Sequence, residues 1–134
     1  MTVRRFDSAT AWEAEIGYSR AVRRGRYVAV SGTTAMDGTR LVGEGDAGAQ
    51  ARFACEKIEA ALEAVGAHVT DLLRVRLYVT DEADVPAVLE AFSEAYGAVR
   101  PAATLLVVGG FIDARLLVEI EADAVIDSDV EAAT

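Results

Sequence analysis

Two stretches of the chain repeat apolar residues at the spacing of an amphipathic helix. Between residues 46 and 65 the apolar positions recur every three or four residues, while arginine and glutamate occupy the opposite side. This pattern predicts a helix, and Gly66 is suited to end it because glycine tolerates the left-handed conformation that commonly follows a helix. Residues 84–96 repeat the pattern before Gly97 and predict a second helix.

Other stretches alternate apolar and polar residues or are rich in β-branched residues, so they predict strands. The predicted strands cover residues 26–32, 72–80, 103–108 and 115–126. Residues 20–22 can pair with the first of these strands through the turn at Gly25. On the second strand, the alternation assigns four residues to the apolar face: Leu73, Val75, Leu77 and Val79. The glycines between residues 36 and 48 predict an irregular loop.

This order of elements predicts an α+β fold in which a β-sheet carries both helices on one face. In residues 115–126 one face is apolar, whereas the other carries Glu119, Glu121 and Asp123. We therefore expect the helix-free face to be solvated or to form an interface. The length of 134 residues fits one domain, with a core at about residues 16–126 and an acidic C-terminal tail at 127–134.

The composition narrows the possible partners. A net charge of −9 opposes binding to a phosphate backbone, so no nucleic-acid partner is expected. A single cysteine forms no internal disulfide and favours a reducing compartment. The chain has no apolar signal core and no apolar run of the ~20 residues that a membrane helix needs. We expect a cytoplasmic protein with no membrane partner.

Few residues are candidates for chemistry. The three carboxylates of the last strand stand at intervals of ~7 Å on one face and repel one another, so Arg74, Arg76 or water must offset them. They form either a solvated, ion-paired face or a site in which one carboxylate lines a cleft, has a raised pKa and activates water.

The remaining candidates favour structural roles. His68 is the only histidine, without a second ligand or a nucleophile nearby, so we predict neither a metal site nor a catalytic triad. Cys55 fits the buried helix face. The basic cluster favours a solvated hairpin, with attraction of an anionic metabolite as the alternative; its members are Arg20, Arg23, Arg24 and Arg26. No cofactor-binding motif occurs.

Several short motifs together resemble those of the RidA (YjgF-like) superfamily, from about residue 16 to residue 125. They are "IGYSRAV", "VSGTTA", "AQARFACEKIEAALEAVGA" with "VTDLLRVRLYVTD", "FSEAYGAVRPA" and "LLVEIEADAV". The resemblance implies a chorismate-mutase-like fold, a homotrimer with ligand clefts between subunits, and a small-molecule metabolite as partner. Typical members hydrolyse enamines and imines to carbonyl compounds and release ammonia. Others are described as ribonucleases or binding proteins.

The resemblance also implies roles for individual residues. Glu119 matches the glutamate of the cleft that positions or activates water, and Tyr18 matches an aromatic residue that lines the cleft. Ser31 and Gly32 match a Ser-Gly pair at the end of the early strand. At Ala103, typical deaminases instead have an arginine that binds the substrate carboxylate.

Two further positions depart from the family pattern: Leu105 replaces a common cysteine and Leu89 replaces a helix asparagine. Loss of the arginine would weaken binding of a carboxylate by roughly 10- to 100-fold. We therefore expect a ligand that is uncharged, larger or more apolar, polarised by backbone N–H groups near Ala103 and Thr104. The sequence leaves open whether a replacement cation is supplied by Arg20, Arg100 or Arg115.

Two functions follow from these residues. The first is hydrolysis of an enamine, imine or related C=N compound, with Glu119 orienting water and Tyr18 packing on the ligand. The alternative is a non-catalytic trimer that binds a ligand or another protein and has lost the deaminase activity. RNA cleavage is disfavoured by the acidity of the chain and by the absence of a histidine pair.

Overall fold

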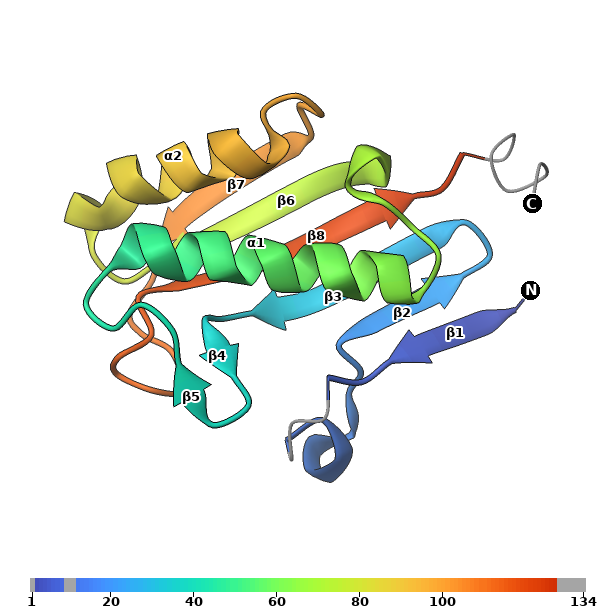
Figure 1. The fold of residues 1–134 in the computed structure, drawn as a ribbon, viewed down its shortest axis with the longest axis horizontal. Coiled ribbons are helices and arrows are strands. Elements are labelled where there is room, and N and C mark those ends of the chain that lie inside the picture. Colours follow the sequence, from blue (N-terminus) through green and yellow to red (C-terminus); the bar gives the residue numbers. More distant parts are fainter. Residues whose placement is uncertain (1, 9–11, 128–134) are drawn as a thin grey trace.

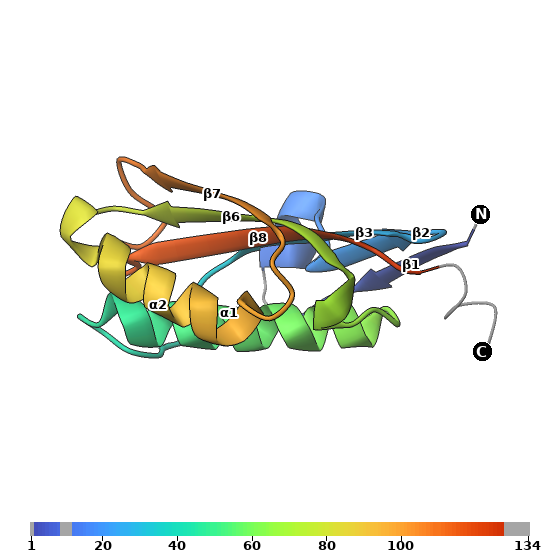
Figure 2. The ribbon, with the colours of Figure 1, turned by 90° about the horizontal axis from the view of Figure 1, so that it is seen from above.

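The computed structural model describes residues 2–8 and 12–127 (Figure 1). Six strands form one sheet, and the two long helices lie side by side on one of its faces (Figure 2). The helices are α1 (Ala47–Ala64) and α2 (Val85–Tyr96). The strands, in their order across the sheet, are β1 (Val3–Phe6), β2 (Ala21–Arg24), β3 (Tyr27–Thr33), β8 (Val118–Val125), β6 (Leu72–Val79) and β7 (Ala102–Val107).

Smaller elements complete the described part of the chain. A two-stranded ribbon is formed by β4 (Met36–Asp37) and β5 (Arg40–Leu41), and a π-helical turn covers Glu13–Gly17. Two short 3-10 turns precede β6 and α2, at Val69–Asp71 and Glu82–Asp84. The neighbouring strands of the large sheet run antiparallel, except that β6 and β7 are parallel. Helix α2 makes the crossover that a parallel pair requires.

Helix α1 confirms the predicted amphipathic pattern. Asp46 caps its N-terminus by accepting a hydrogen bond from the Ala49 backbone N–H at 3.0 Å, which satisfies one of the donors left free at a helix start. The buried side of α1 is rich in alanine, and it packs against the sheet and against α2. Gly66 follows with a φ of +86°, the left-handed conformation expected after the helix.

Strand β8 confirms the predicted separation of the two sheet faces. Val118, Ile120, Ala122 and Ala124 are each at most 1% exposed beneath the helices. The alternate residues, which include the three carboxylates, are only partly buried on the helix-free face. The burial of apolar side chains against α1 and α2 therefore determines which face carries the charges.

The structure differs from the predicted elements in several places. The sheet begins at β1, before the expected start of the core at residue 16, and part of the expected loop at residues 36–48 forms the β4–β5 ribbon. The predicted inward position of Leu73 is wrong, because that side chain is 58% exposed. The β6–β8 pairing shifts between Leu72 and Arg74, and such an irregularity reverses the alternation. The expected tail lies outside the described residues, apart from Asp127.

Candidate functional site

A cavity of about 580 Å³ lies beside β3 and β8. Its wall combines segments that are far apart in the sequence: the residues before β2, the end of β3, the β4–β5 ribbon, the middle of α1 and the chain leading into β8. The volume falls within the usual range of small-molecule sites. Glu119, Tyr18 and Gly32 all line it, so the structure brings together three of the predicted site residues.

The Glu119 side chain lies against residue 32 of β3. Any residue other than glycine at that position would force the Glu119 carboxylate to move. A Cβ atom at residue 32 would lie 2.9 Å from the Cδ atom and 3.3 Å from the Cγ atom of Glu119, with a carboxylate oxygen nearer still. The β3–β8 pairing is irregular between Val30 and Thr33, directly beside this contact. The absence of a side chain at Gly32 therefore makes room for the Glu119 carboxylate.

The surroundings of Glu119 favour its protonated form. Burial raises the pKa of this half-buried carboxyl, Arg20 opposes the shift, and Glu121 adds to it. Removal of water disfavours a charged carboxylate, whereas a nearby cation favours it. A raised pKa brings a carboxylate closer to the range in which a general base works well near neutral pH.

Arg20 is the most deeply buried cation of the cavity wall, with 7% of its surface exposed. Its Nη1 atom donates to the backbone oxygens of Gly32 at 2.5 Å and Ser31 at 3.4 Å, and to Thr33 Oγ1 at 3.0 Å. Its guanidinium carbon lies 5.7 Å from the centre of the Tyr18 ring, within the range of a cation–π contact. Arg20 therefore fixes both the irregular end of β3 and the aromatic ring.

Lys57 supplies a second cation from the middle of α1. Its Nζ atom donates to the backbone oxygens of Met36 at 2.7 Å and Thr34 at 3.4 Å. Burial lowers the pKa of Lys57, and the positive charge of Arg20 lowers it further. The sequence did not predict a role for Lys57 in the site, because its spacing is that of an ordinary charged residue on the polar side of the helix.

Gln50 ties helix α1 to the segment that leads into β8. The side chain is fully buried; its Nε2 atom donates to the backbone oxygens of Gly43 and Arg115, both at 3.1 Å. Its Oε1 atom accepts from the Leu117 backbone N–H at 2.9 Å. The bonds to Arg115 and Leu117 hold the segment that leads into β8 and borders the cavity, so this buried amide fixes one side of the site. The sequence pattern did not indicate this role.

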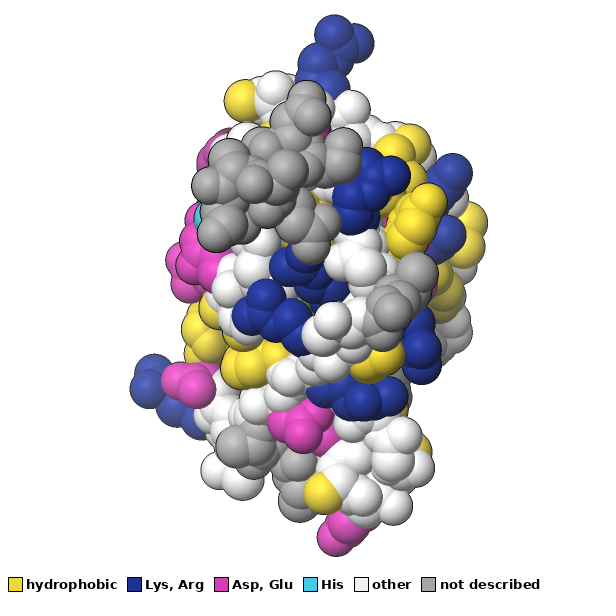
Figure 3. Space-filling view, turned by 90° about the vertical axis from the view of Figure 1, so that its right-hand side faces the viewer, with side chains coloured by type: hydrophobic (Ala, Val, Ile, Leu, Met, Phe, Trp, Pro, Cys, Tyr) yellow, Lys and Arg dark blue, Asp and Glu magenta, His cyan; other side chains and the backbone are white. Residues whose placement is uncertain are grey.

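The basic cluster separates into buried and exposed arginines. Arg23 is 9% exposed, and it donates from Nη1 to the Val65 backbone oxygen at 3.0 Å, at the end of α1. Together with the burial of Arg20, this makes the interpretation of a solvated hairpin wrong for two of the four residues. Arg24 and Arg26 are exposed. Figure 3 views the end of the molecule where the β2–β3 turn lies, and several Lys and Arg side chains gather there.

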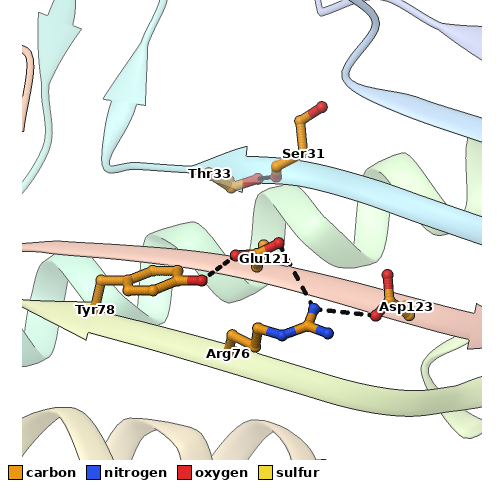
Figure 4. A network of polar contacts seen from close by, with 6 residues as sticks. All are labelled: Ser31, Thr33, Arg76, Tyr78, Glu121 and Asp123. Carbon is orange, nitrogen blue, oxygen red and sulfur yellow. Dashed lines mark hydrogen bonds and ion pairs between the residues drawn. The ribbon is translucent and has the colours of Figure 1, made fainter. Parts of the chain in front are cut away.

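The other two carboxylates of β8 are held by partners on the helix-free face (Figure 4). Tyr78 donates a short hydrogen bond to Glu121, and this bond raises the pKa of Tyr78. Arg76 lies 3.1 Å from an Asp123 oxygen and 3.7 Å from a Glu121 oxygen. Arg76 therefore offsets these two charges as predicted, and Glu119 is the member of the trio that lines the cavity.

The remaining predicted site residues lie elsewhere in the chain. Ser31 donates to the Ser19 backbone oxygen at 2.7 Å and borders the site without lining the cavity. Leu89 is exposed on α2. The other three lie on the edge strand β7, outside the cavity wall: Ala103, Thr104 and Leu105. Because a cleft between subunits needs a second chain, the roles of these residues stay predictions.

The three arginines that could replace the missing clamp differ in position. Arg20 and Arg115 line the cavity, whereas Arg100 does not. The Arg115 guanidinium already pairs with Asp113, at 2.8 Å and 3.1 Å. Arg100 is exposed just before β7, with a φ of +57°. Arg20 is therefore the candidate that combines burial with access to the cavity.

The two other candidates from the sequence have structural surroundings. Cys55 is buried beside Tyr96, and burial raises the pKa of its thiol to about 11, which makes it a poor nucleophile. His68 lies before a 3-10 turn, and its backbone N–H donates to Asp71 at 2.9 Å. Within the described ranges, no group of His, Cys, Asp and Glu side chains could hold a metal ion, and no helix is long and apolar enough to cross a membrane.

Comparison with known proteins identifies the family. The family model described as Endoribonuclease L-PSP matches residues 8–126. The chain belongs to this YjgF/RidA family. It is 43% identical to an uncharacterized protein of Streptomyces coelicolor over 122 residues, which are 91% of each chain.

Solved structures agree with this family assignment. A Mycobacterium tuberculosis member of the YjgF/YER057c/UK114 family is 40% identical, with a TM-score of 0.85 over 93% of this chain and 100% of that chain. A Thermotoga maritima structure described as a putative endoribonuclease is 30% identical, with a TM-score of 0.81 over 93% and 99% of the two chains. The α+β fold predicted from the sequence is therefore confirmed as the fold of this family.

Proposed function

We propose that this YjgF/RidA-family protein binds a small metabolite in the cavity and hydrolyses the C=N bond of an imine, or of the imine that an enamine forms by tautomerisation. The observation that carries the proposal is the Glu119 carboxylate, which is half-buried against Gly32 at the cavity wall. Tyr18 supplies an aromatic surface in the same cavity. A carboxylate with a raised pKa beside a bound ligand is suited to general base catalysis.

The proposed reaction needs only water and a group that moves protons. Glu119 accepts a proton as the water oxygen bonds to the carbon of the C=N group, and the π electrons of that group move to nitrogen, which takes up a proton from solvent. The C–N bond of the resulting carbinolamine then breaks: the nitrogen leaves as ammonia, the hydroxyl proton passes to solvent, and a carbonyl compound remains. Glu119 can return its proton to the departing nitrogen, so that the carboxylate is regenerated.

Assembly into a homotrimer is part of the proposal. The described chain leaves several large apolar side chains exposed on or beside the sheet, including Tyr27, Leu73, Leu106 and Val107. Exposed apolar side chains at an open strand edge favour burial against another chain. Light scattering coupled to size-exclusion chromatography should give three times the mass of one chain, and a monomer would contradict this part.

Replacement of Glu119 by glutamine tests the catalytic role. We expect kcat/KM for a panel of imines, generated in the cuvette and followed by ammonia release, to fall by about 10²- to 10⁴-fold. Glu121→Gln is the matched control, since it removes the same charge from the same face of β8 at a position outside the cavity. Undiminished turnover by the Glu119 variant would refute the mechanism.

The alternative of a non-catalytic ligand-binding trimer is favoured by one observation, the alanine at position 103. It predicts that the wild-type protein releases no ammonia from any imine of the panel while still binding a metabolite saturably. RNA cleavage has less support, because the chain combines a net charge of −9 with a single histidine. RNA cleavage that disappears in the Glu119 variant would reverse this order.

A further inference from the structure

The chain leaves the large sheet at the end of β3, where one wall of the cavity begins. The β3–β8 pairing is irregular between Val30 and Thr33, and the next residues lead into the β4–β5 ribbon. Within the described part of the chain, this ribbon pairs with no strand of the six-stranded sheet (Figure 1). Four residues of this stretch line the cavity: Thr34, Met36, Gly38 and Thr39. The ribbon is therefore a wall of the cavity that strand pairing does not fix to the large sheet.

Lys57 joins this wall to helix α1. Its Nζ atom donates to the backbone oxygens of Met36 at 2.7 Å and Thr34 at 3.4 Å. Backbone oxygens that lie outside a sheet ladder need other partners when they are shielded from water, and hydrogen bonds from a charged donor are about twice as strong as neutral ones. Arg20 binds two backbone oxygens at the end of β3 in the same way. Two cations therefore hold successive parts of one segment, Arg20 the end of β3 and Lys57 the start of the ribbon.

Lys57 occupies a position that is unfavourable for a charge. Its side chain is half-buried; burial lowers its pKa, and the nearby charge of Arg20 lowers it further. Glu13 and Asp37 act in the opposite direction. Placing a cation there costs free energy, which hydrogen-bond acceptors can offset. The two carbonyl oxygens of the wall are such acceptors, so the charge of Lys57 and the position of the ribbon stabilise each other.

We propose that Lys57 is a positioning residue for ligand binding: its ammonium group holds the β4–β5 ribbon against α1 and so keeps this wall of the cavity in place. Lys57 acts through the backbone of the ribbon and not by contact with the reacting atoms. The attachment of the ribbon is independent of any reaction. Its effect on turnover rests on the proposed function, because that effect requires a ligand that reacts in this cavity.

Hydrogen exchange followed by mass spectrometry tests the attachment without a ligand. Lys57→Met removes the donors and keeps a long, unbranched side chain, so we expect the backbone amides of residues 35–42 to exchange about 10- to 100-fold faster. The amides of β6 should keep their wild-type rates. Arg52→Met is the matched control, since Arg52 is a cation of the same helix that pairs with Glu94 outside this cavity. Unchanged ribbon exchange in Lys57→Met would overturn the inference, and so would an equal acceleration in β6, which would indicate a loss of global stability.

Lys57→Arg tests whether the charge is what holds the ribbon. Arginine stays charged throughout the working pH range, whereas loss of the Lys57 proton weakens both hydrogen bonds. In the wild-type protein, KM for an imine of the panel should therefore rise with pH, below the ordinary range of a lysine because burial and Arg20 lower the pKa of Lys57. Lys57→Arg should lack this rise. The same dependence of KM on pH in both proteins would refute the role of the ammonium group.

Steady-state kinetics separate the wall from the chemistry. In Lys57→Met we expect KM to rise about tenfold and kcat to change by less than about threefold, as for an interaction that contributes equally in the ground and transition states. A fall in kcat with unchanged KM would place Lys57 in the chemistry and overturn the inference. If Lys57→Met does not fold, Lys57→Gln takes its place, because its neutral amide is one atom closer to the helix and lacks the charge.

The exchange measurement separates this inference from the proposed catalysis. Faster ribbon exchange in Lys57→Met, without imine turnover by the wild-type protein, would refute the proposed function and leave the attachment in place. Imine turnover that depends on Glu119, with wild-type ribbon exchange and KM in Lys57→Met, would refute the attachment and leave the catalysis in place.

Discussion

Replacing Gly32 by alanine tests whether the position of the Glu119 carboxylate controls the reaction. The new Cβ atom would lie 2.9 Å from Glu119 Cδ, whereas ordinary contacts begin at 3.4 Å. The carboxyl carbon of Glu119 must therefore move away by at least the difference between these two distances, and the nearer carboxylate oxygen must move farther. Gly32 has no left-handed φ, so alanine fits the backbone and the strain falls on the end of a flexible side chain.

The expected result is a loss of activity without a loss of fold. A displaced side chain costs about 0.5–1.5 kcal/mol when it leaves its preferred rotamer, and alanine regains about 0.4–1 kcal/mol by restricting the unfolded chain. The free energy of unfolding should therefore change by less than about 1 kcal/mol. A misplacement of about 1 Å can reduce a rate 100-fold, so we expect kcat/KM for an imine to fall about 10- to 100-fold.

Urea unfolding and an ammonia-release assay on the same preparations measure the two effects. Gly109→Ala is the control, because a Cβ atom there would meet no atom within 4 Å and the φ is not left-handed. Wild-type kcat/KM in Gly32→Ala would show that the observed position of Glu119 does not matter for catalysis. A destabilisation above about 2 kcal/mol would show instead that the carboxylate cannot move aside.

Three further predictions follow from buried groups. Because burial raises the pKa of Glu119, kcat/KM should fall on acidification at a pH above the usual range of a glutamate; a fall confined to that ordinary range would contradict the raised pKa. Gln50→Leu leaves the Arg115 oxygen and the Leu117 N–H without their partner, so chemical denaturation should show a loss of about 2–4 kcal/mol. Cys55, with a pKa of about 11 and 5% exposure, should react with iodoacetamide only as fast as the protein unfolds.

The sequence predicted the elements whose periodicity is strong and uninterrupted. Helix α1 and strand β8 could be recognised because burial against a single partner layer imposes one regular spacing on each. Leu73 was placed on the wrong face because a shift in the β6–β8 pairing reverses the alternation at that point. Strand β1 was missed because Val3–Phe6 is short and contains two arginines.

The site was harder to predict because its polar residues look like surface residues in the sequence. Lys57 occupies a polar position of α1, and Arg20 belongs to a run of arginines. Only the folded chain distinguishes Arg20, which turns toward the end of β3, from Arg24, which stays exposed. Such differences depend on which segments meet at the cavity, and local periodicity carries no information about those contacts.

The positions of Ala103 and Arg20 determine whether a ligand site beside Glu119 would need a second subunit. Ala103 lies on the edge strand β7, outside the cavity, so a clamp at that position could act on a ligand beside Glu119 only across a subunit boundary. Arg20 lines the same cavity as Glu119 and Tyr18 within one chain. If Arg20 replaces the missing clamp, the cation and the base belong to a single chain, and their relative position is set by the β2–β3 and β3–β8 pairings. Binding of a small acid should then persist in a variant whose trimer has been dissociated by charges on β7, whereas a clamp shared between subunits would lose it.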